Sequence, residues 1–389
     1  MKTPISLLCA CLPVLALAAP YTPADGSAVI EQLPRRADAT QMALRGLRQQ
    51  LTARPQDLAL ATGLAQRYIA LARSETDPRY LGYAQAALAP WWRQAAPPVP
   101  VRLLRATILQ STHHFDAALQ DLDAIIAQEP ANGQAWLTRA TVLTVQGDYE
   151  KATASCARLS ALATQLVTVT CIANVAGVTG RAAKSEQLLD LTLQRSAGTA
   201  PELEHWALSL LAEMAARRGD ATLAEARFRQ AMAQQPRDSY LLGAYSDFLL
   251  DQRRAPEVIT LLKDQQRIDA LLLRQALAMQ AVRNQDAPLK AATAELAARF
   301  NAAMQRGDTV HQREQARFAL FLQRDSAGAL LLAQNNWAIQ KEAADMRILL
   351  EAAVMARDRA AARPVLDWIA AHKVEDVALQ ALARKAGAL

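Results

Sequence analysis

Small and large apolar residues recur along the chain at a near-constant interval, and this recurrence predicts a repeated pair of helices. Two antiparallel helices pack closely only where small residues let their backbones approach and a bulky residue fills the adjacent hole. Three such positions, Ala106, Phe115 and Ala118, return 34 residues later as Ala140, Tyr149 and Ala152. A third copy contains Ala212, Gly219-Asp220, Ala224, Phe228, Ala231 and Pro236. The alanines are therefore predicted to be packing positions, with Tyr149 and Phe228 as the bulky residues.

The turn inside each pair has its own sequence pattern. Gly147 tolerates a backbone conformation that other residues avoid, and Asp148 places a carboxylate at the positive end of the second helix. Pro130 and Pro236 end one pair before the next begins. One pair cannot bury its apolar face alone, so neighbouring pairs are expected to stack into a continuous array.

The composition agrees with an all-α protein. Only 14 Gly and 17 Pro occur in 389 residues, and no segment alternates Val, Ile or Thr with polar residues as an exposed strand would. Residues 20–40 contain several prolines and are predicted to be an extended leader. Residues 41–389 are predicted to form one solenoid, with regular repeats at 99–166 and 205–262, divergent repeats elsewhere and a capping helix at 374–383.

Residues 136–152 and 212–236 closely resemble tetratricopeptide repeats in their small, large and turn positions. This resemblance implies a right-handed superhelical solenoid of antiparallel helix pairs, in which the first helix of each pair lines the inner surface. Tetratricopeptide proteins of bacterial envelopes typically act as assembly scaffolds. The resemblance therefore implies a binding protein that is not an enzyme.

The amino terminus is predicted to be a signal peptide covering residues 1–19. Lys2 precedes an apolar run from Ile5 to Ala19, and the run ends in a small-x-small cleavage pattern. The run is too short to span a membrane, which takes about 20 apolar residues. Export to the periplasm or the medium as a soluble protein is therefore expected. A second interpretation, lipoprotein anchoring near Cys9 and Cys11, fits less well because the apolar region before these cysteines is too short.

Two cysteines remain after the predicted cleavage, and their spacing favours a disulfide. Cys156 and Cys171 lie equally far from a turn expected at 161–164, so they should face each other across an antiparallel helix pair. An oxidising compartment would favour the bond, and closing a loop of this size contributes about 3 kcal/mol. The alternative is a pair of buried thiols that pack as small apolar residues.

The predicted inner surface is polar in the early repeats and more aromatic and charged in the later ones. Its candidate partner-binding residues are Thr107, Thr141, Trp206, Arg217 and Tyr240. Aromatic side chains bury large areas at low entropic cost, so Trp206 and Tyr240 are the candidate anchors. The competing interpretation is that these two aromatics pack between repeats. We expect the inner surface to hold a peptide or helix of an envelope protein.

Arginines near the intra-pair turns suggest a different function. The net charge is +6, and Arg217, Arg218, Arg253, Arg254, Arg324 and Arg357 recur close to these turns. A row of arginines could guide an anionic exported polysaccharide, although solvated cations that complement helix carboxyl ends are the favoured explanation.

No recognisable catalytic or phosphate-binding motif occurs in the sequence. His113 and His114 are adjacent residues near a helix start and point apart, so they do not form a metal site by themselves. We therefore expect no cofactor, no metal and no enzymatic activity. A nucleic-acid partner is not expected either, since no known nucleic-acid-binding module is present.

Overall fold

A computed structural model describes residues 25, 39–196, 198–282, 286–308 and 310–388. The predicted signal peptide and nearly all of the predicted leader therefore lie outside the described residues. The chain divides into two units, Met1–Leu47 and Arg48–Leu389. Helix α1 (Ala39–Ala53) begins in the first unit, and the second unit is described by itself below.

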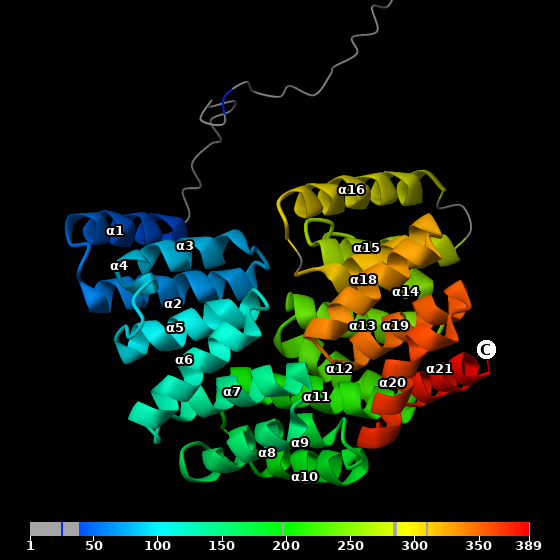
Figure 1. Ribbon diagram of the computed structural model, residues 1–389, viewed down its shortest axis with the longest axis horizontal. Helices are drawn as coiled ribbons and strands as arrows, with labels where there is room; N and C mark the ends of the chain where they lie inside the picture. The colour runs from blue at the N-terminus through cyan, green and yellow to red at the C-terminus, as the bar shows by residue number, and fades with distance from the viewer. Residues whose placement is uncertain (1–24, 26–38, 197, 283–285, 309, 389) are drawn as a thin grey trace, which may run out of the picture. The chain divides into compact units, whose positions relative to one another are not determined.

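The second unit is built from consecutive antiparallel helix pairs (Figure 1). Within the described residues no strand is present, which confirms the predicted all-α class. The first five pairs are α2 (Leu58–Ser74) with α3 (Arg79–Ala87), α5 (Val99–Ser111) with α6 (Phe115–Gln128), α7 (Gly133–Gln146) with α8 (Tyr149–Arg158), α9 (Gln165–Ala176) with α10 (Ala182–Arg195), and α11 (Pro201–Arg218) with α12 (Ala221–Gln234). A short helix α4 (Ala89–Trp92) joins the first two pairs, and a 3₁₀ turn (Leu159–Ala161) extends α8.

The later pairs follow the same order. They are α13 (Ser239–Asp251) with α14 (Ala255–Leu261), α15 (Asp269–Ala281) with α16 (Asp286–Gln305), α17 (Gln312–Arg317) with α18 (Ser326–Ile339), and α19 (Ala343–Ala356) with α20 (Arg359–His372). A π-helical segment, Phe318–Gln323, continues α17, and α21 (Val377–Gly387) ends the stack. Among the described residues, no helix has the length and apolar character needed to cross a membrane.

A left-handed backbone conformation marks the turn inside most pairs. Gly147 and Gly219 adopt it with φ of 84°. The side chain of the following residue, Asp148 or Asp220, accepts a hydrogen bond from a backbone N–H of the next helix, as the sequence pattern predicts. The same conformation occurs at three turn arginines, which sequence reasoning treated only as surface charge: Arg253, Arg324 and Arg357. The repeat turn is therefore kept even where its glycine is absent.

The residues predicted to pack the repeats are all buried. Phe228 is 1% exposed and stacks on Tyr245 with ring centroids 5.3 Å apart. Tyr149 is 6% exposed. The small residues between the helices, at most 1% exposed, are Ala106, Ala118, Ala140, Ala152, Ala212, Ala224 and Ala231. The core is accordingly a series of neighbouring apolar clusters along the stack, because each pair buries its surface against adjacent pairs.

The predicted disulfide joins two consecutive pairs. Cys156 on α8 is bonded to Cys171 on α9, and the two Cα atoms are 5.6 Å apart. Both residues are buried in one apolar cluster that also contains Ala140 and Tyr149. The disulfide interpretation is therefore confirmed, and the alternative of two free thiols is wrong.

Candidate functional site

Tyr240, a candidate anchor, is an exposed aromatic residue on the first helix of its pair. Its side chain is 66% exposed, and its hydroxyl donates a hydrogen bond to Glu213 Oε1 on α11 at 2.7 Å. The negative charge of Glu213 raises the pKa of the Tyr240 hydroxyl well above its usual value. Burial raises the pKa of Glu213 itself, although the positive charge of Arg217 partly lowers it. Two neighbouring pairs thus present a linked aromatic and acidic surface.

Arg217 lies one helical turn after Glu213 and is incompletely satisfied. Its Nε and Nη2 atoms are buried, and neither has a hydrogen-bond partner among the described residues. The guanidinium packs against Gly177, where an added Cβ would lie 3.6 Å from Nη2. Because these two donors have no exposed surface, a ligand cannot reach them, and Arg217 acts on its neighbours through its charge.

A charged residue at the start of α19 influences Glu213 and Tyr240 electrostatically, and a residue of α17 pairs with it. Glu342, at the start of α19, raises the pKa values of both Glu213 and Tyr240 through its charge. Arg313 on α17 donates to Glu342 at 3.0 Å and lies 3.4 Å from Asp345. We call Glu213, Arg217, Tyr240, Arg313 and Glu342 the inner surface. It combines residues more than 120 positions apart, from α11 and α13 on one side and from α17 and α19 on the other.

Asp247, on the same helix as Tyr240, fixes three helices to one another. Its carboxylate pairs with Arg274 on α15 at 2.6 Å and with Arg317 on α17 at 3.0 Å. Although burial acts to raise its pKa, the two guanidinium groups outweigh this effect and hold the pKa of Asp247 well below its usual range. This carboxylate is therefore part of the packing and is already neutralised.

The other predicted partner-binding residues are less available. Trp206 is partly buried and packs against the apolar cluster around the disulfide. Thr107 and Thr141 donate their hydroxyl hydrogens to backbone carbonyls of their own helices, those of Leu103 at 2.9 Å and Leu137 at 3.1 Å. The structure therefore brings Arg217 and Tyr240 together through Glu213 but does not join the two threonines to them.

The loop before α19 and the end of α20 contact the α7–α8 turn directly. The Lys341 N–H donates to the Val145 carbonyl at 2.7 Å, and the Tyr149 hydroxyl is 3.4 Å from the Lys341 carbonyl. Trp368 lies over Gly147, where an added Cβ would be only 2.5 Å from Trp368 Cζ2. The Gly147 turn is therefore covered by residues more than 190 positions further along the chain.

The next two turns are covered in the same way. Lys373 packs against Gly180, and Glu375 Oε2 accepts a hydrogen bond from the Ala182 N–H at 2.7 Å. Val377 packs against Gly219, and α21 contacts α11, as Figure 1 also shows. Sequence reasoning missed these contacts. The one signal for them is Arg181, which follows the turn glycine where the other glycine turns have Asp148 and Asp220.

Two of the turn arginines proposed as an anionic-polymer surface are already paired. Arg218 donates to Glu186 at 2.5 and 3.0 Å. Arg254 binds Glu225 at 2.6 Å and Glu257 at 2.5 Å. These two arginines are therefore ion-paired as well as partly exposed, and their ion pairs join helices or stabilise a helix start.

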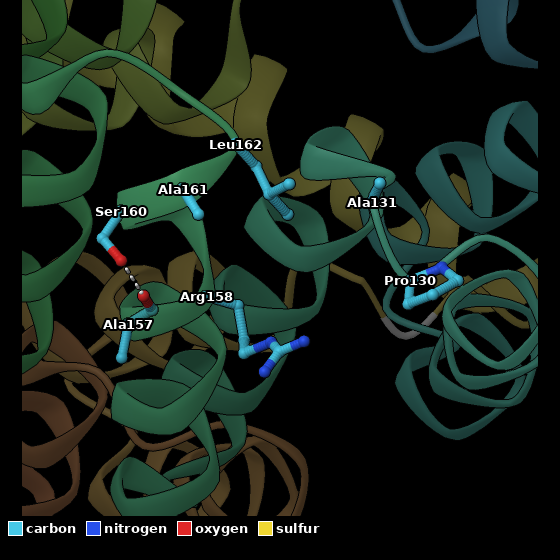
Figure 2. Close-up of a pocket in the computed structure, with 7 residues that line it drawn as sticks. All are labelled: Pro130, Ala131, Ala157, Arg158, Ser160, Ala161 and Leu162. Atoms are coloured by element: carbon cyan, nitrogen blue, oxygen red, sulfur yellow. Dashed lines mark hydrogen bonds between the residues drawn. The ribbon is translucent and has the colours of Figure 1, made fainter.

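A hollow with a cavity volume of about 380 Å³ lies between the α6–α7 loop and the end of α8 (Figure 2). Small apolar residues form most of its lining, and Arg158 extends into it while packing 5.4 Å from the centre of the Trp136 ring. The full lining is Pro130, Ala131, Ala157, Arg158, Ser160, Ala161 and Leu162. It belongs to the loops between pairs and is separate from the inner surface.

The two adjacent histidines make separate contacts. His113 stacks on Phe115 with ring centroids 5.3 Å apart, and His114 Nδ1 is 3.0 Å from the Thr112 hydroxyl. Within the described part of the chain, no group of three or more His, Cys, Asp or Glu residues is arranged to hold a metal ion.

Solved structures align with the chain at low sequence identity. A tetratricopeptide repeat protein from Parabacteroides merdae is 15% identical over 74% of this chain and 98% of its own, with a TM-score of 0.35. The human IFIT1 dimer with m7Gppp-AAAA is 13% identical over 90% of this chain and 87% of its own, with a TM-score of 0.41. The P58(IPK) TPR domain is 14% identical over 85% of this chain and 98% of its own, with a TM-score of 0.24.

The fold is a tetratricopeptide-like solenoid. Two of these aligned structures are tetratricopeptide proteins by name. The assignment itself rests on the helix pairs and their turns. No protein-family model and no curated protein matches the chain.

Proposed function

We propose that the protein is an exported scaffold, without enzymatic activity, that binds an extended segment of an envelope protein on its inner surface. The observation that carries this proposal is Tyr240, a large aromatic side chain left 66% exposed on the first helix of its pair, with its hydroxyl bonded to Glu213 of the neighbouring pair. Exposed aromatic and arginine side chains are the residues most enriched among those that dominate binding energy.

Export is supported by two independent features. The amino-terminal sequence has the charged, apolar and small-residue regions of a signal peptide. The Cys156–Cys171 disulfide is typical of proteins that fold in oxidising compartments. Fractionation of cells expressing the tagged chain tests this location, and recovery of uncleaved protein in the cytoplasm would contradict it.

The binding proposal is tested by site-specific photo-crosslinking in the native cell envelope. A photoreactive amino acid replaces Tyr240 in one variant and Leu191, an exposed residue on the outer helix α10, in the control. We expect an envelope protein to be captured reproducibly from position 240 and not from position 191. Identical adducts from both positions would overturn the assignment of the inner surface.

A substitution provides the second arm of this experiment. Tyr240→Ala should weaken capture by a cross-linker placed elsewhere on α13 while leaving the circular dichroism spectrum unchanged, because the side chain is mostly exposed. Leu191→Ala is the matched control, since it also removes an exposed apolar side chain. Trp206 is less suitable for this purpose because it also packs against the disulfide cluster.

The alternative of a solenoid that guides an anionic polysaccharide gains no support from Arg218 and Arg254, which are already paired with carboxylates. Binding of an anionic glycan that falls steeply with salt, and with Arg→Gln changes at these positions, would revive it.

A further inference from the structure

The carboxyl-terminal residues 341–377 touch four successive intra-pair turns. Lys341 and Trp368 contact the turn at Gly147, and Lys373 and Glu375 contact the turn at Gly180. The remaining two contacts are Val377 with Gly219 and Arg347 with Asp251, the last residue of α13. We call residues 341–377 the clasp.

The clasp has an apolar core separate from that of the α7–α8 turn it covers. One apolar cluster lies between residues 316 and 386, and another, around the disulfide, lies mainly between residues 140 and 178. These two clusters have one residue in common, Trp368. Opening this contact would therefore separate the two cores without dividing either of them.

Apolar contacts also lie outside the shared residue, because the His372 ring packs edge-on against Tyr149 with centroids 4.9 Å apart and Val377 packs against Gly219. The remaining contacts are polar and partly exposed. The Arg347–Asp251 ion pair is bidentate at 2.7 Å, and its side chains are 35% and 38% exposed. Exposed ion pairs hold two elements together only weakly, because water solvates the separated charges well. The Glu375 contact is a single hydrogen bond to the amino end of α10.

We propose that the clasp opens and closes, and that its opening controls access of large ligands to the inner surface. Glu342 joins the two: it begins α19 within the clasp, and its carboxylate accepts a hydrogen bond at 3.0 Å from Arg313, a residue of the inner surface. The access role rests on the function proposed above, whereas the opening itself can be measured without any partner.

Opening is measured by hydrogen exchange of two backbone amides in the full chain. Lys341 N–H bonds to Val145 and Ala182 N–H bonds to Glu375, so both are protected only while the clasp is closed. Arg347→Asp places a carboxylate beside Asp251 and also beside Glu351, with which Arg347 pairs at 2.8 Å within α19. The change should speed exchange at both amides about three- to ten-fold. Asp251→Asn weakens the same ion pair from the opposite side and should have a smaller effect in the same direction.

Two controls separate opening from general destabilisation. Arg363→Asp makes the same charge change in an ion pair contained within α20, between Arg363 and Asp367, and should leave both amides unchanged. The charge-swapped variant Asp251→Arg with Arg347→Asp should restore protection. If both amides exchange at the rate of global unfolding in every variant, the clasp is a fixed part of the fold and the proposal fails.

Access is measured by thiol labelling with a 5-kDa polyethylene-glycol maleimide, which imitates a large ligand. Tyr240→Cys and the outer-helix control Leu188→Cys are compared in a chain carrying Cys9→Ser and Cys11→Ser, with the disulfide intact. Tyr240 and Leu188 are 66% and 50% exposed, so the informative quantity is the change within each position. Labelling at position 240 should rise several-fold in Arg347→Asp, whereas labelling at position 188 should stay the same. An unchanged rate at position 240 would show that the clasp does not limit access.

The two proposals fail in different ways. Faster exchange and labelling in Arg347→Asp without specific capture from position 240 would keep the clasp and reject the binding function. Specific capture with unchanged exchange would keep the binding function and reject the clasp.

Discussion

The α7–α8 turn and the α9–α10 turn occupy equivalent places in consecutive repeats, but their second helices are capped differently. At the first turn, Asp148 follows Gly147 and caps the backbone N–H of Lys151 at 3.2 Å. At the second turn, Arg181 follows Gly180 and provides no side-chain cap, so Glu375 from the clasp accepts from Ala182 instead. The first cap comes from within its own repeat, whereas the second depends on a residue 193 positions away.

The largest expected effect concerns the disulfide that joins these two pairs. Replacing both Cys156 and Cys171 with Ala should lower the free energy of unfolding by about 3 kcal/mol, because the unfolded chain regains the entropy of an open loop. Urea denaturation followed by circular dichroism measures this change. The parent protein under reducing conditions should match the variant, and a much smaller loss would show that helix packing alone holds the two pairs together.

The next effect tests how closely the clasp packs on the first turn. Gly147→Ala should destabilise the protein by about 2 to 3 kcal/mol, because φ is 84° and the new Cβ would lie 2.5 Å from Trp368. Gly198→Ala is the matched control, since φ is 81° and no atom lies within 4 Å of the added Cβ. The control should lose only about 1 kcal/mol. Equal losses in thermal or urea unfolding would mean that Trp368 moves aside freely.

A pH effect of intermediate size is expected from Asp345, a buried clasp residue. Burial raises its pKa to about 6, above the value of about 3.9 for an unfolded chain. Between these values the folded protein binds more protons than the unfolded one, so this residue makes stability fall as pH rises from about 4 to about 6. Asp345→Asn should remove that dependence and reduce the stability difference between pH 4.5 and pH 7 by roughly 2 kcal/mol.

Urea denaturation at the two pH values measures this difference in parent and variant. Other groups whose pKa is raised, such as Glu213 and Asp376, contribute to both proteins and cancel in the comparison. Parallel pH profiles would show that Asp345 keeps the same charge throughout this range.

The smallest effect tests the two caps directly. Asp148→Ala and Glu375→Ala should each cost about 1 kcal/mol, the usual value for a lost helix cap. Hydrogen exchange should distinguish them: the first change should affect Lys151, and the second should affect Ala182 and also Lys341 across the clasp. If Glu375→Ala leaves Ala182 protected, the α9–α10 turn does not depend on the clasp.

The helix pairs could be predicted because their determinants are local. Small residues at Ala140 and Ala152, a turn at Gly147-Asp148 and a cysteine spacing centred on the next turn all act within about 35 residues. Arg253, Arg324 and Arg357 were harder to interpret, since glycine is the residue that normally marks a left-handed turn. Their recurrence near the turns was visible, but their backbone role required the structure.

The inner surface was predicted only in part. Arg217 and Tyr240 were identified from the repeat register, and the structure links them through Glu213. Trp206 instead packs mainly within the repeats, because the register places a residue on a helix but does not show how closely the neighbouring pair approaches. Glu342 and Arg313 could not be assigned, since they come from repeats more than 70 residues beyond Tyr240.

Local sequence therefore determined the helix class, the pairing, the turns and the disulfide, because each depends on residues within one or two repeats. Tertiary structure alone decided that the clasp meets Gly147, Gly180, Gly219 and Asp251. In a stack of helical repeats, each pair is generally rotated slightly relative to the one before it, and these rotations add up along the stack. The total rotation cannot be read from the sequence of one repeat. The contact between the clasp and the distant turns therefore depends on the assembled solenoid.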